Sequence, residues 1–366
     1  MVVSFDGVGW HDRWERWLDL AERVPFRFTG FLSGTYLLSD QTRDRYHPPG
    51  YPAGTSAIGW RPAADVPVEI ADLNRAAAAG MEIGTHFNGH FCATAGLPAG
   101  GDTWTTGDWN AELDQFFALL ADVGPNNDLS SPRLQVGRGD ILGARTPCLE
   151  GDPGQLYPAL RQHGVEYDAS SSTTGLVWPR RDESGLWLVG MPVYPVHGAL
   201  PDGRTGVPVT AMDYNYFFTQ RGASSVGVTP AESAADGRQV LATYRDMYRA
   251  AYRGNRAPIV LGNHFNDWND DAYTQALATF VEQTCGRPDT ECVPFRDLVA
   301  WLDVQTPRTQ RRPRGAAGGG GCAAIGTLVV VGGQWGRTDL AKAEPARTTR
   351  GGRGGAGQSW NRCRLE

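Results

Sequence analysis

Residues 84–90, with the sequence GTHFNGH, come directly after the short apolar run 81–83 and place two imidazoles four residues apart just past an expected strand end. At that spacing one helical turn would stack both side chains on one face, and neutral imidazoles suit zinc and its neighbours in the transition series. Gly89 argues against a long helix, so we expect a single turn at the mouth of a strand, where α/β proteins usually keep their chemistry. Because isolated His-x-x-x-His pairs are common by chance, the meaning of this pair depends on partners elsewhere in the chain.

The composition is that of a globular enzyme. The chain has 366 residues, of which 41% are hydrophobic and 20% charged, so it can form one large domain or two modest ones. The net charge of −6 gives no reason to expect binding to nucleic acid or to an anionic membrane. The 12 Trp and 12 Tyr provide flat amphipathic rings, which line carbohydrate clefts as well as protein cores.

Short apolar runs rich in strand formers alternate along the chain with segments of helical periodicity. The expected strands are residues 2–5, 26–31, 81–85, 141–145, 165–168 and 258–264. The expected helices are residues 10–24, 66–79, 109–120, 155–162, 231–252, 270–283 and 296–301. Because strands and helices alternate and most strands end at a polar residue, we predict an α/β fold, namely an irregular parallel β/α barrel.

Three segments carry further expectations. The first helix has Asp12 as its expected N-cap, and Glu15 three residues later would complete a capping box. The helical spacing of its tryptophans favours packing against the protein core over stacking on a bound sugar. Residues 39–60, rich in Pro, Gly and Tyr, form a long irregular loop of a kind that is usually functional. Between residues 169 and 228 we expect short strands and turns and no helix. These strands and turns could form the bottom or the side of a cleft.

Chemically active side chains recur at the expected strand ends. In chain order they are Asp6, His86 with His90, Arg145, Asp168 and His264. Each alone has a structural explanation, such as a capped turn, a core histidine or an ion pair, but the joint series is hard to reach by accident. The series resembles the polysaccharide deacetylase family, also called the NodB homology domain or carbohydrate esterase family 4, as a divergent member. The resemblance covers about residues 1–305 and implies a deacetylase domain on an irregular β/α barrel.

The resemblance implies a role for each catalytic residue. Asp6 falls where the family keeps its general base, and His264 falls where a histidine serves as general acid. Arg145 stands where an arginine orients the base, and Asp168 stands where an aspartate steadies that arginine.

The resemblance also implies a divalent metal ion, expected to be Zn with Co or Ni as alternatives. His86 and His90 match two of the family's metal ligands. Gly7 stands where the family's metal-binding aspartate belongs, so the third ligand is open. Asp6 itself could ligate the metal, or the site could bind metal weakly or not at all.

Two further residues could replace the metal-binding aspartate that is missing at Gly7, and the chain departs from the family pattern at a second position. His11 or Asp12 could swing in from the next turn as the third ligand, although Asp12 already has a sufficient explanation as a helix cap. A second departure is Gly262, which stands two residues before His264 where Leu is usual.

The expected function follows from the chemistry of these groups. A divalent metal can lower the pKa of bound water toward ~7, a carboxylate can take the remaining proton, and an imidazolium can protonate the departing amine. Together with this chemistry, the resemblance implies a metal-dependent hydrolase that removes N-acetyl groups from a polysaccharide or cell-wall glycan. The alternatives are a catalytically silent barrel that binds glycan and an amidase of the same fold acting on a small molecule. The expected partner is an N-acetylated glycan, with no nucleic acid, no transmembrane segment and a monomeric state.

The cysteine pattern indicates a compartment. Cys285 and Cys292 bracket a short polar loop that a disulfide could close, whereas Cys92 and Cys148 each follow a site motif, so their pairing would tie two active-site loops together. Buried free thiols are the alternative. Both disulfides would imply an oxidising compartment. Because no secretory signal is visible, either the protein is cytoplasmic or its natural start lies upstream; we favour an upstream start and a secreted or cell-envelope location.

The composition changes after Pro307, where basic and then glycine-rich segments follow. Such a composition predicts a disordered Gly/Arg-rich tail over residues 306–366. The one apolar run in it, residues 325–331, is far too short to span a bilayer. We therefore expect one catalytic barrel over residues 1–305, followed by a tail to which no function is assigned.

Overall fold

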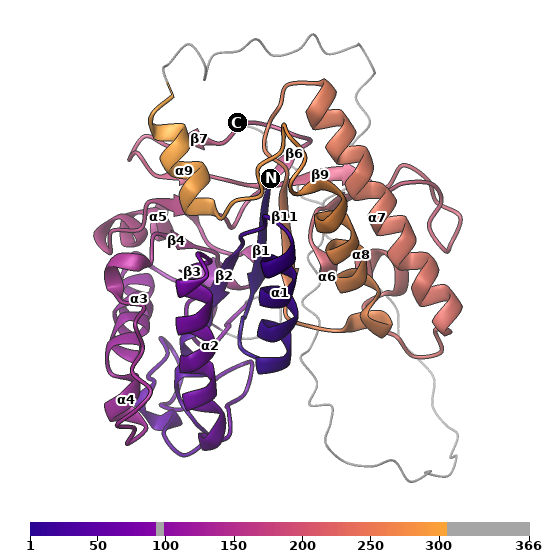
Figure 1. Cartoon of the computed structure of the whole chain (residues 1–366). Coiled ribbons are helices and arrows are strands. Elements are labelled where there is room, and N and C mark those ends of the chain that lie inside the picture. Colours follow the sequence, from indigo (N-terminus) through magenta and orange to yellow (C-terminus); the bar gives the residue numbers. More distant parts are fainter. Residues whose placement is uncertain (93–98, 306–366) are drawn as a thin grey trace, which may run out of the picture. The chain divides into compact units, whose positions relative to one another are not determined.

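The computed structural model describes residues 1–92 and 99–305, and their central feature is an eight-stranded sheet (Figure 1). In spatial order its strands are β11 (Val260–His264), β1 (Val2–Asp6), β2 (Thr29–Leu32), β3 (Glu82–Thr85), β4 (Gly143–Ala144), β5 (Tyr167–Asp168), β8 (Trp187–Leu188) and β7 (Arg180–Arg181). Neighbouring strands are parallel except for β8 and β7. Since β11 and β7 are edges, the sheet is an open half-barrel, which confirms the predicted irregular parallel β/α barrel.

Helices connect the parallel strands and cover the sheet. They are α1 (His11–Arg23), α2 (Val66–Ala78), α3 (Thr106–Ala121), α4 (Val123–Asn126), α5 (Pro153–Gln162), α6 (Asp213–Arg221), α7 (Pro230–Arg253), α8 (Trp268–Thr284) and α9 (Phe295–Asp303). Helix α1 packs beside α2, α3 beside α5, and α7 beside α8 (Figure 1). Because each crossover brings the chain back to the same end of the sheet, the carboxyl ends of the parallel strands gather along one edge.

Capping boxes start two of the long helices. Thr105 accepts a hydrogen bond from the amide of Asp108 at the start of α3, and Thr229 does the same with Glu232 at the start of α7. Each box satisfies amide groups that the first helical turn leaves without a partner. Pro230 follows as the first residue of α7, where its missing N–H costs nothing.

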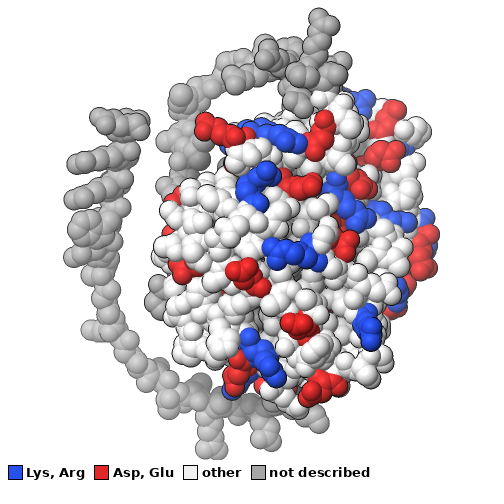
Figure 2. All heavy atoms as spheres, turned by 90° about the vertical axis from the view of Figure 1, so that its left-hand side faces the viewer, with Lys and Arg blue, Asp and Glu red and all other residues white. Residues whose placement is uncertain are grey.

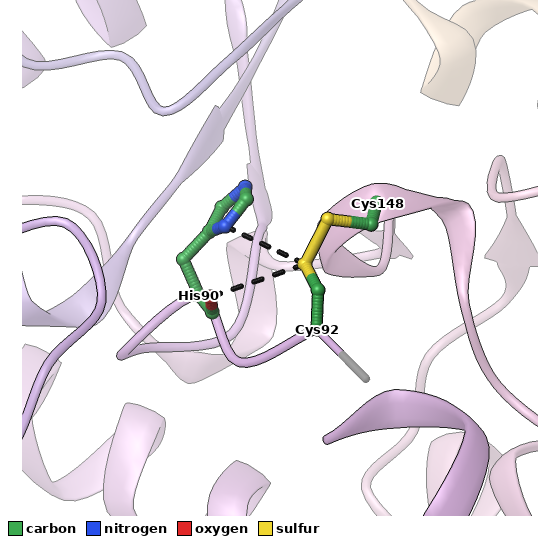
Figure 3. A group of neighbouring side chains, drawn as sticks. All are labelled: His90, Cys92 and Cys148. Carbon is green, nitrogen blue, oxygen red and sulfur yellow. Dashed lines mark hydrogen bonds between the residues drawn. A yellow bond between two sulfur atoms is a disulfide. The ribbon is translucent and has the colours of Figure 1, made fainter. Parts of the chain in front are cut away.

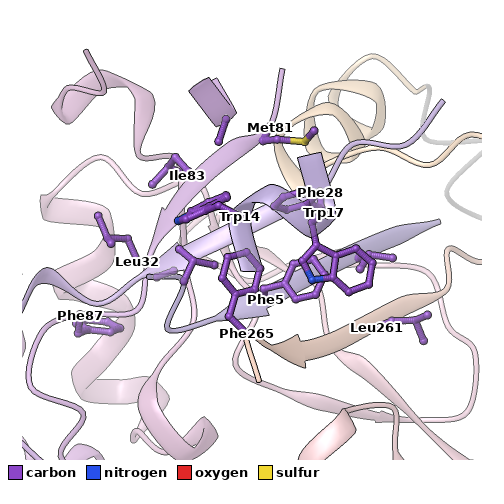
Figure 4. Close-up of a cluster of buried hydrophobic side chains, with 14 of the residues drawn as sticks. Phe5, Trp14, Trp17, Phe28, Leu32, Met81, Ile83, Phe87, Leu261 and Phe265 are labelled. Atoms are coloured by element: carbon purple, nitrogen blue, oxygen red, sulfur yellow. The ribbon is translucent and has the colours of Figure 1, made fainter. Parts of the chain in front are cut away.

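Aromatic side chains from α1 and β1, together with Phe28 just before β2 and Phe265 just after β11, form the centre of the core (Figure 4). The ring of Phe5 lies 4.6 Å from that of Trp17 and 5.0 Å from that of Phe265. Trp14 is fully buried and meets Phe265 edge to face at 4.9 Å. The prediction that these tryptophans belong to the core is therefore confirmed for Trp14 and Trp17, whereas Trp10 remains 45% exposed.

The expected cap of the first helix is wrong. Helix α1 begins at His11, its N-cap residue is Trp10, and no side chain caps it. Asp12 is instead an exposed residue of the first turn that pairs with Arg13 at 3.4 Å. Its charge still favours the positive end of the helix dipole, which explains why it resembles a cap in the sequence.

The expectation of no helix between residues 169 and 228 is also wrong, because α6 lies there. Its sequence alternates polar and aromatic residues without a clear apolar stripe, so periodicity does not reveal it. The signal that was available is Gly222, which ends α6 in the left-handed conformation at φ 61°.

The same region forms a second, three-stranded sheet of β10 (Pro208–Thr210), β9 (Met191–Pro195) and β6 (Ser172–Thr174). It is joined to the large sheet where Met212 forms a parallel bridge to Gly262 of β11. A Cβ atom on Gly262 would collide with the sulfur of Met191 and the methyl group of Met212. These two side chains occupy the space that a leucine would need, which explains the glycine at this position.

Both expected disulfides are confirmed. Cys92 is bonded to Cys148, and Cys285 is bonded to Cys292. The first joins the loop after β3 to the loop after β4, and the second closes the short connection between α8 and α9.

The last described helix is α9, which matches the expected final helix; the predicted tail, residues 306–366, lies outside the described residues. Within residues 1–92 and 99–305 no helix is long and apolar enough to cross a membrane. Figure 2 shows acidic and basic side chains interspersed over the face in view. Some such charges join elements, for example Arg13 with Asp267 at 3.0 Å and Arg16 with Asp271 at 2.7 Å, which link α1 to the segment around the start of α8.

Candidate functional site

The site begins with Asp6, the last residue of β1. Every residue of β1 is buried, and the strand lies between β11 and β2, with Asp6 opposite His264 and Phe31. One carboxylate oxygen of Asp6 accepts a hydrogen bond from Nη1 of Arg145 at 2.8 Å. Burial opposes ionisation of Asp6, but the guanidinium of Arg145, with smaller contributions from the neighbouring imidazoles, outweighs it and lowers the pKa of Asp6 below its ordinary value. Asp6 is therefore ionised at neutral pH.

Arg145 follows β4 and is completely buried. Nη1 also donates to Oγ of Ser4 at 2.7 Å, and Nε donates to the carbonyl oxygen of Ala169 at 2.9 Å. The guanidinium lies 4.6 Å from the ring centre of Phe31. Among the described residues, Nη2 has no hydrogen-bond partner. Arg145 is thus held rigidly beside Asp6 with one donor left over.

The expected support of Arg145 by Asp168 is not a direct contact: in the described chain no ion pair joins their side chains, although the charge of Arg145 acts on the carboxyl group of Asp168. Asp168 instead accepts hydrogen bonds from the amide and hydroxyl of Ser170, and burial raises its pKa to about 6. The strand register gives the reason. Ala144 stands opposite Asp168, so Arg145 lies one residue further along, where it meets the Ala169 carbonyl.

His86 comes directly after β3, and its amide donates to the carbonyl oxygen of Leu32 at 2.8 Å. Its Nδ1 lies 2.8 Å from the carbonyl oxygen of Arg145. A carbonyl only accepts, so Nδ1 carries the proton and Nε2 keeps its lone pair, which is the tautomer that a metal ligand needs. Burial lowers the pKa of His86, which keeps the ring neutral.

His90 lies four residues on, and its ring centre is 5.1 Å from that of His86. Burial lowers the pKa of His90 to about 3, so this ring is also neutral at physiological pH. The expected helical turn is wrong: residues 86–90 form a bend in which Phe87 and His90 are both left-handed, with φ 57°. Left-handed backbone at residues other than glycine needs support from its surroundings.

That support comes from Glu112 of α3, which lies buried beneath the bend. Its carboxylate accepts hydrogen bonds from the amide of Asn88 at 3.1 Å and from the hydroxyl of Tyr46 at 2.8 and 2.9 Å. The Tyr46 oxygen in turn accepts from the amide of Gly89 at 3.2 Å. Burial raises the pKa of Glu112 to about 7. Sequence reasoning missed Glu112, although Tyr46 does lie in the long loop expected to be functional.

His264 ends β11 and is paired with Asp213, the first residue of α6. The carboxylate of Asp213 accepts hydrogen bonds from Nδ1 and from the backbone amide of His264, both at 2.7 Å. Burial lowers the pKa of His264, but the charge and hydrogen bond of Asp213 outweigh it, so that the net pKa is raised. Sequence reasoning missed Asp213, which lies in the region where no helix was expected.

Gly7 has φ 60°, the left-handed region that glycine adopts most easily. A Cβ atom here would meet the hydroxyl oxygen of Tyr36 at 3.6 Å and the hydroxyl of Ser33 at 4.0 Å, which are ordinary contacts. A larger side chain therefore has room at Gly7, and the obstacle is the backbone conformation.

His86 and His90 are both neutral, as imidazole ligands of a metal must be, but a third ligand is not in place beside them. Among the described residues, two groups of three have ligand atoms within 4.8 Å of one another, and the set of Asp6, His86 and His90 is not one of them. The carboxylate of Asp6 is directed at Arg145.

The two groups themselves do not supply that third ligand. In the first, His90, Cys92 and Cys148, the sulfurs form a disulfide. The second, His11, Glu15 and Asp72, is a surface cluster in which His11 is 57% exposed and bonded to Asp72 at 3.0 Å. The expectation that His11 or Asp12 might swing into the site is therefore wrong, because His11 is held by α2 and Asp12 is exposed.

Fold and site together define a class of protein: an irregular β/α barrel with a carboxylate–imidazole pair and a histidine pair at the carboxyl ends of its strands. Solved structures to which the chain is similar include polysaccharide deacetylases and members of carbohydrate esterase family 4.

Three solved structures illustrate this. A protein assigned as a polysaccharide deacetylase from Mycobacterium smegmatis is 16% identical, with 86% of this chain and 93% of that chain covered and a TM-score of 0.49. One from Pseudomonas aeruginosa is 13% identical, with coverages of 80% and 73% and a TM-score of 0.47. A family 4 pseudoenzyme from Bacillus anthracis is 10% identical, with coverages of 81% and 64% and a TM-score of 0.39. No family profile matches the sequence, and no curated protein is similar to it.

Proposed function

We propose that this protein is a hydrolase that removes N-acetyl groups from a polysaccharide or cell-wall glycan. The observation that carries the proposal is the pairing of Asp6 with His264 on adjacent strands, with pKa values displaced in opposite directions. Asp6 is ionised and His264 tends to be protonated, and such a divergence is how active sites separate a base from an acid.

Each residue then has one task in the reaction. Asp6 accepts a proton from the attacking water, and the hydrogen bond from Arg145 keeps the carboxylate ionised and oriented. His264 gives its proton to the amide nitrogen as the bond to the acetyl carbon breaks, because an amine leaves poorly unless it is protonated. Asp213 holds His264 in the protonated form and fixes the direction of its ring.

His86 and His90 would hold a divalent metal ion, with Zn, Co and Ni as the candidates. When bound, such an ion activates water and polarises the acetyl carbonyl group. Asp6 is the proposed third ligand, through the carboxylate oxygen that Arg145 does not hold, and because its ligand atoms do not gather with those of His86 and His90 within 4.8 Å, we expect weak metal binding.

Acetate release tests the proposal. We expect purified protein supplied with Zn, Co or Ni to release acetate from chitooligosaccharide or peptidoglycan. His264→Asn should lower kcat by roughly 10²- to 10⁴-fold, the usual contribution of a general acid. His197→Asn is the matched control, because His197 forms a similar 2.7 Å pair with Asp246 on the surface. Equal loss in both variants, or no effect of His264→Asn on measurable release, would refute the assignment.

A second candidate is a catalytically silent barrel that binds glycan. Gly7 favours it, because the missing carboxylate leaves the histidine pair without its third ligand. The two functions are separated by measuring retention on insoluble chitin or peptidoglycan together with acetate release. Retention without release under every metal tested identifies the silent binder.

We further propose that the protein acts in an oxidising compartment, secreted or in the cell envelope. Two disulfides support this, one of them between the two loops that carry His90 and Arg145. Peptide mapping under non-reducing conditions after oxidising expression should recover both bridges, and four free thiols there would remove the argument.

A further inference from the structure

The imidazole of His90 lies against the disulfide between Cys92 and Cys148, and Figure 3 shows the ring beside the two sulfur atoms. Nδ1 of His90 is 3.7 Å from Sγ of Cys92. A ring nitrogen of His90 and both sulfurs are candidate ligand atoms that lie within 4.8 Å of one another. One nitrogen and two sulfurs thus converge on one point, from two loops that the fold itself brings together.

We propose that reduction of the Cys92–Cys148 disulfide converts this group into a binding site for a thiophilic metal such as zinc, with Nδ1 of His90 and the two cysteine sulfurs as ligands. This ligand set shares His90 with the proposed hydrolytic one but takes its other two ligands from the cysteines, and the inference does not depend on the proposed deacetylation.

The geometry suits such a site. In tetrahedral zinc coordination a ligating nitrogen and sulfur lie about 3.5 Å apart, close to the observed separation of 3.7 Å. Two ligating sulfurs lie roughly 3.8 Å apart, which these atoms can reach once the covalent bond between them is broken. His90 and Cys92 are buried, whereas Cys148 is partly exposed. Metal can therefore enter from the side of Cys148, and water can fill a fourth position.

The backbone also holds these ligands independently of the disulfide. The bend that carries His90 is fixed from below by Glu112 through Asn88. On the other loop, the amide of Glu150 donates to the carbonyl oxygen of Pro147. Both loops follow neighbouring parallel strands, so reduction should leave His90, Cys92 and Cys148 near one another.

Reduction of the Cys92–Cys148 disulfide requires a two-electron reductant, and a phosphine can supply these electrons. A water-soluble phosphine attacks one sulfur and the S–S bond breaks with transfer of two electrons to the sulfurs. The phosphine takes its oxygen from water and becomes a phosphine oxide, and the two protons of that water go to the two thiols. A divalent metal then binds both sulfurs as thiolates and releases their protons to buffer. A dithiol that becomes a disulfide would serve the same purpose.

Cobalt(II) reports on this site directly, because thiolate ligation produces a sulfur-to-cobalt charge-transfer absorption that imidazole ligation cannot produce. We would use the full chain carrying Cys322→Ser and Cys363→Ser, which removes the cysteines beyond the described residues. After phosphine treatment we expect this protein to gain the charge-transfer band with one equivalent of cobalt. The untreated, oxidised protein should show none.

Variants locate the ligands. Cys148→Ser should abolish the band, and His90→Ala should weaken cobalt binding roughly tenfold or more, at least as much as losing an outer-shell partner. The double variant Cys285→Ser with Cys292→Ser is the matched control, because it removes the other disulfide and should leave the band unchanged.

Alkylation provides a measurement that needs no ligand variant. In the reduced protein, zinc should protect Cys92 and Cys148 from iodoacetamide, while Cys285 and Cys292 react as fast as without zinc. The proposal is overturned if the band is absent from reduced protein, if it survives Cys148→Ser, or if zinc protects all four thiols equally. None of these experiments measures acetate release. They therefore test the thiolate metal site even if the proposed deacetylase function is wrong.

Discussion

At the scale of single residues, the partner of His264 decides whether it can act as an acid. Asp213 raises the pKa of His264 against the opposing effect of burial. His264 works protonated, so activity should be lost as pH rises through its pKa. Asp213→Asn removes the charge that raises this pKa, and the alkaline limb of the kcat/KM profile should therefore move to lower pH.

The measurement is acetate release as a function of pH, with Asp246→Asn as the control. Asp246 forms the comparable pair with His197 on the surface, and its loss should leave the limb in place. If Asp213→Asn lowers the rate equally at every pH, Asp213 acts on structure alone and the assignment of His264 as the acid fails.

Gly7 is the second residue on which function depends. Gly7→Asp should strengthen zinc or cobalt binding by the oxidised protein roughly 10- to 100-fold, because it restores a carboxylate beside Asp6. His86→Ala should abolish binding. The left-handed backbone at Gly7 costs an aspartate about 1 kcal/mol, less than most residues would lose there.

The matched control is Gly206→Asp, since Gly206 also has a left-handed backbone at φ 64° and its Cβ would meet nothing within 4 Å. It carries the same conformational cost far from any ligand in the proposed set. If Gly7→Asp leaves metal affinity unchanged while Asp6→Asn destroys it, Asp6 is the ligand and another base must be sought.

At the scale of elements, the bend after β3 depends on Glu112 of α3. Burial raises the pKa of Glu112 from 4.5 to about 7. The folded state therefore prefers the protonated carboxyl, and this preference stabilises the fold fully below pH 4.5 and is lost progressively as pH rises toward 7. This rise in the pKa of Glu112 corresponds to a change on the order of 3 kcal/mol in the free energy of unfolding.

Glu112→Gln removes this ionisation. We expect the variant to be less stable than wild type by about 1 kcal/mol at pH 4.5, from altered hydrogen bonds. Because wild type loses on the order of 3 kcal/mol as pH rises toward 7, the variant should become the more stable of the two before pH 7. Chemical denaturation at several pH values measures this. Glu69→Gln is the comparison, because Glu69 is also buried with its pKa raised to about 7 but lies on α2, so it should show the same pH effect on stability. A pH-independent gap for Glu112→Gln would contradict the argument.

At the scale of the whole molecule, we propose that the folded domain ends close to Gln305 and that the rest of the chain is dispensable for it. Helix α9 buries Phe295, Leu298, Val299 and Leu302 and is the last helix within the described residues. A chain truncated after Pro307 should therefore have the same Tm as the full chain. A Tm lower by several degrees would show that the removed residues pack on the domain, since in a domain of this size each kcal/mol moves Tm by about 2–4 °C.

The sequence by itself determined the alternation of strands and helices and the strand-end positions of Asp6, His86 and His264. These were predictable because apolar runs and the polar residues that follow them are local signals, readable within a few positions. Both disulfides were predictable too, since each cysteine adjoins a recognisable loop.

Only the tertiary structure decided which groups support that site. Asp213 reaches His264 across 51 residues and Tyr46 reaches Glu112 across 66, and nothing in the local pattern marks these residues as partners. The register of β4 and β5 decided that the Ala169 carbonyl, and not the Asp168 carboxylate, meets Arg145. A one-residue difference in register is invisible to periodicity, because pairing between strands depends on long-range packing, whereas the pattern along each strand reports only its own burial.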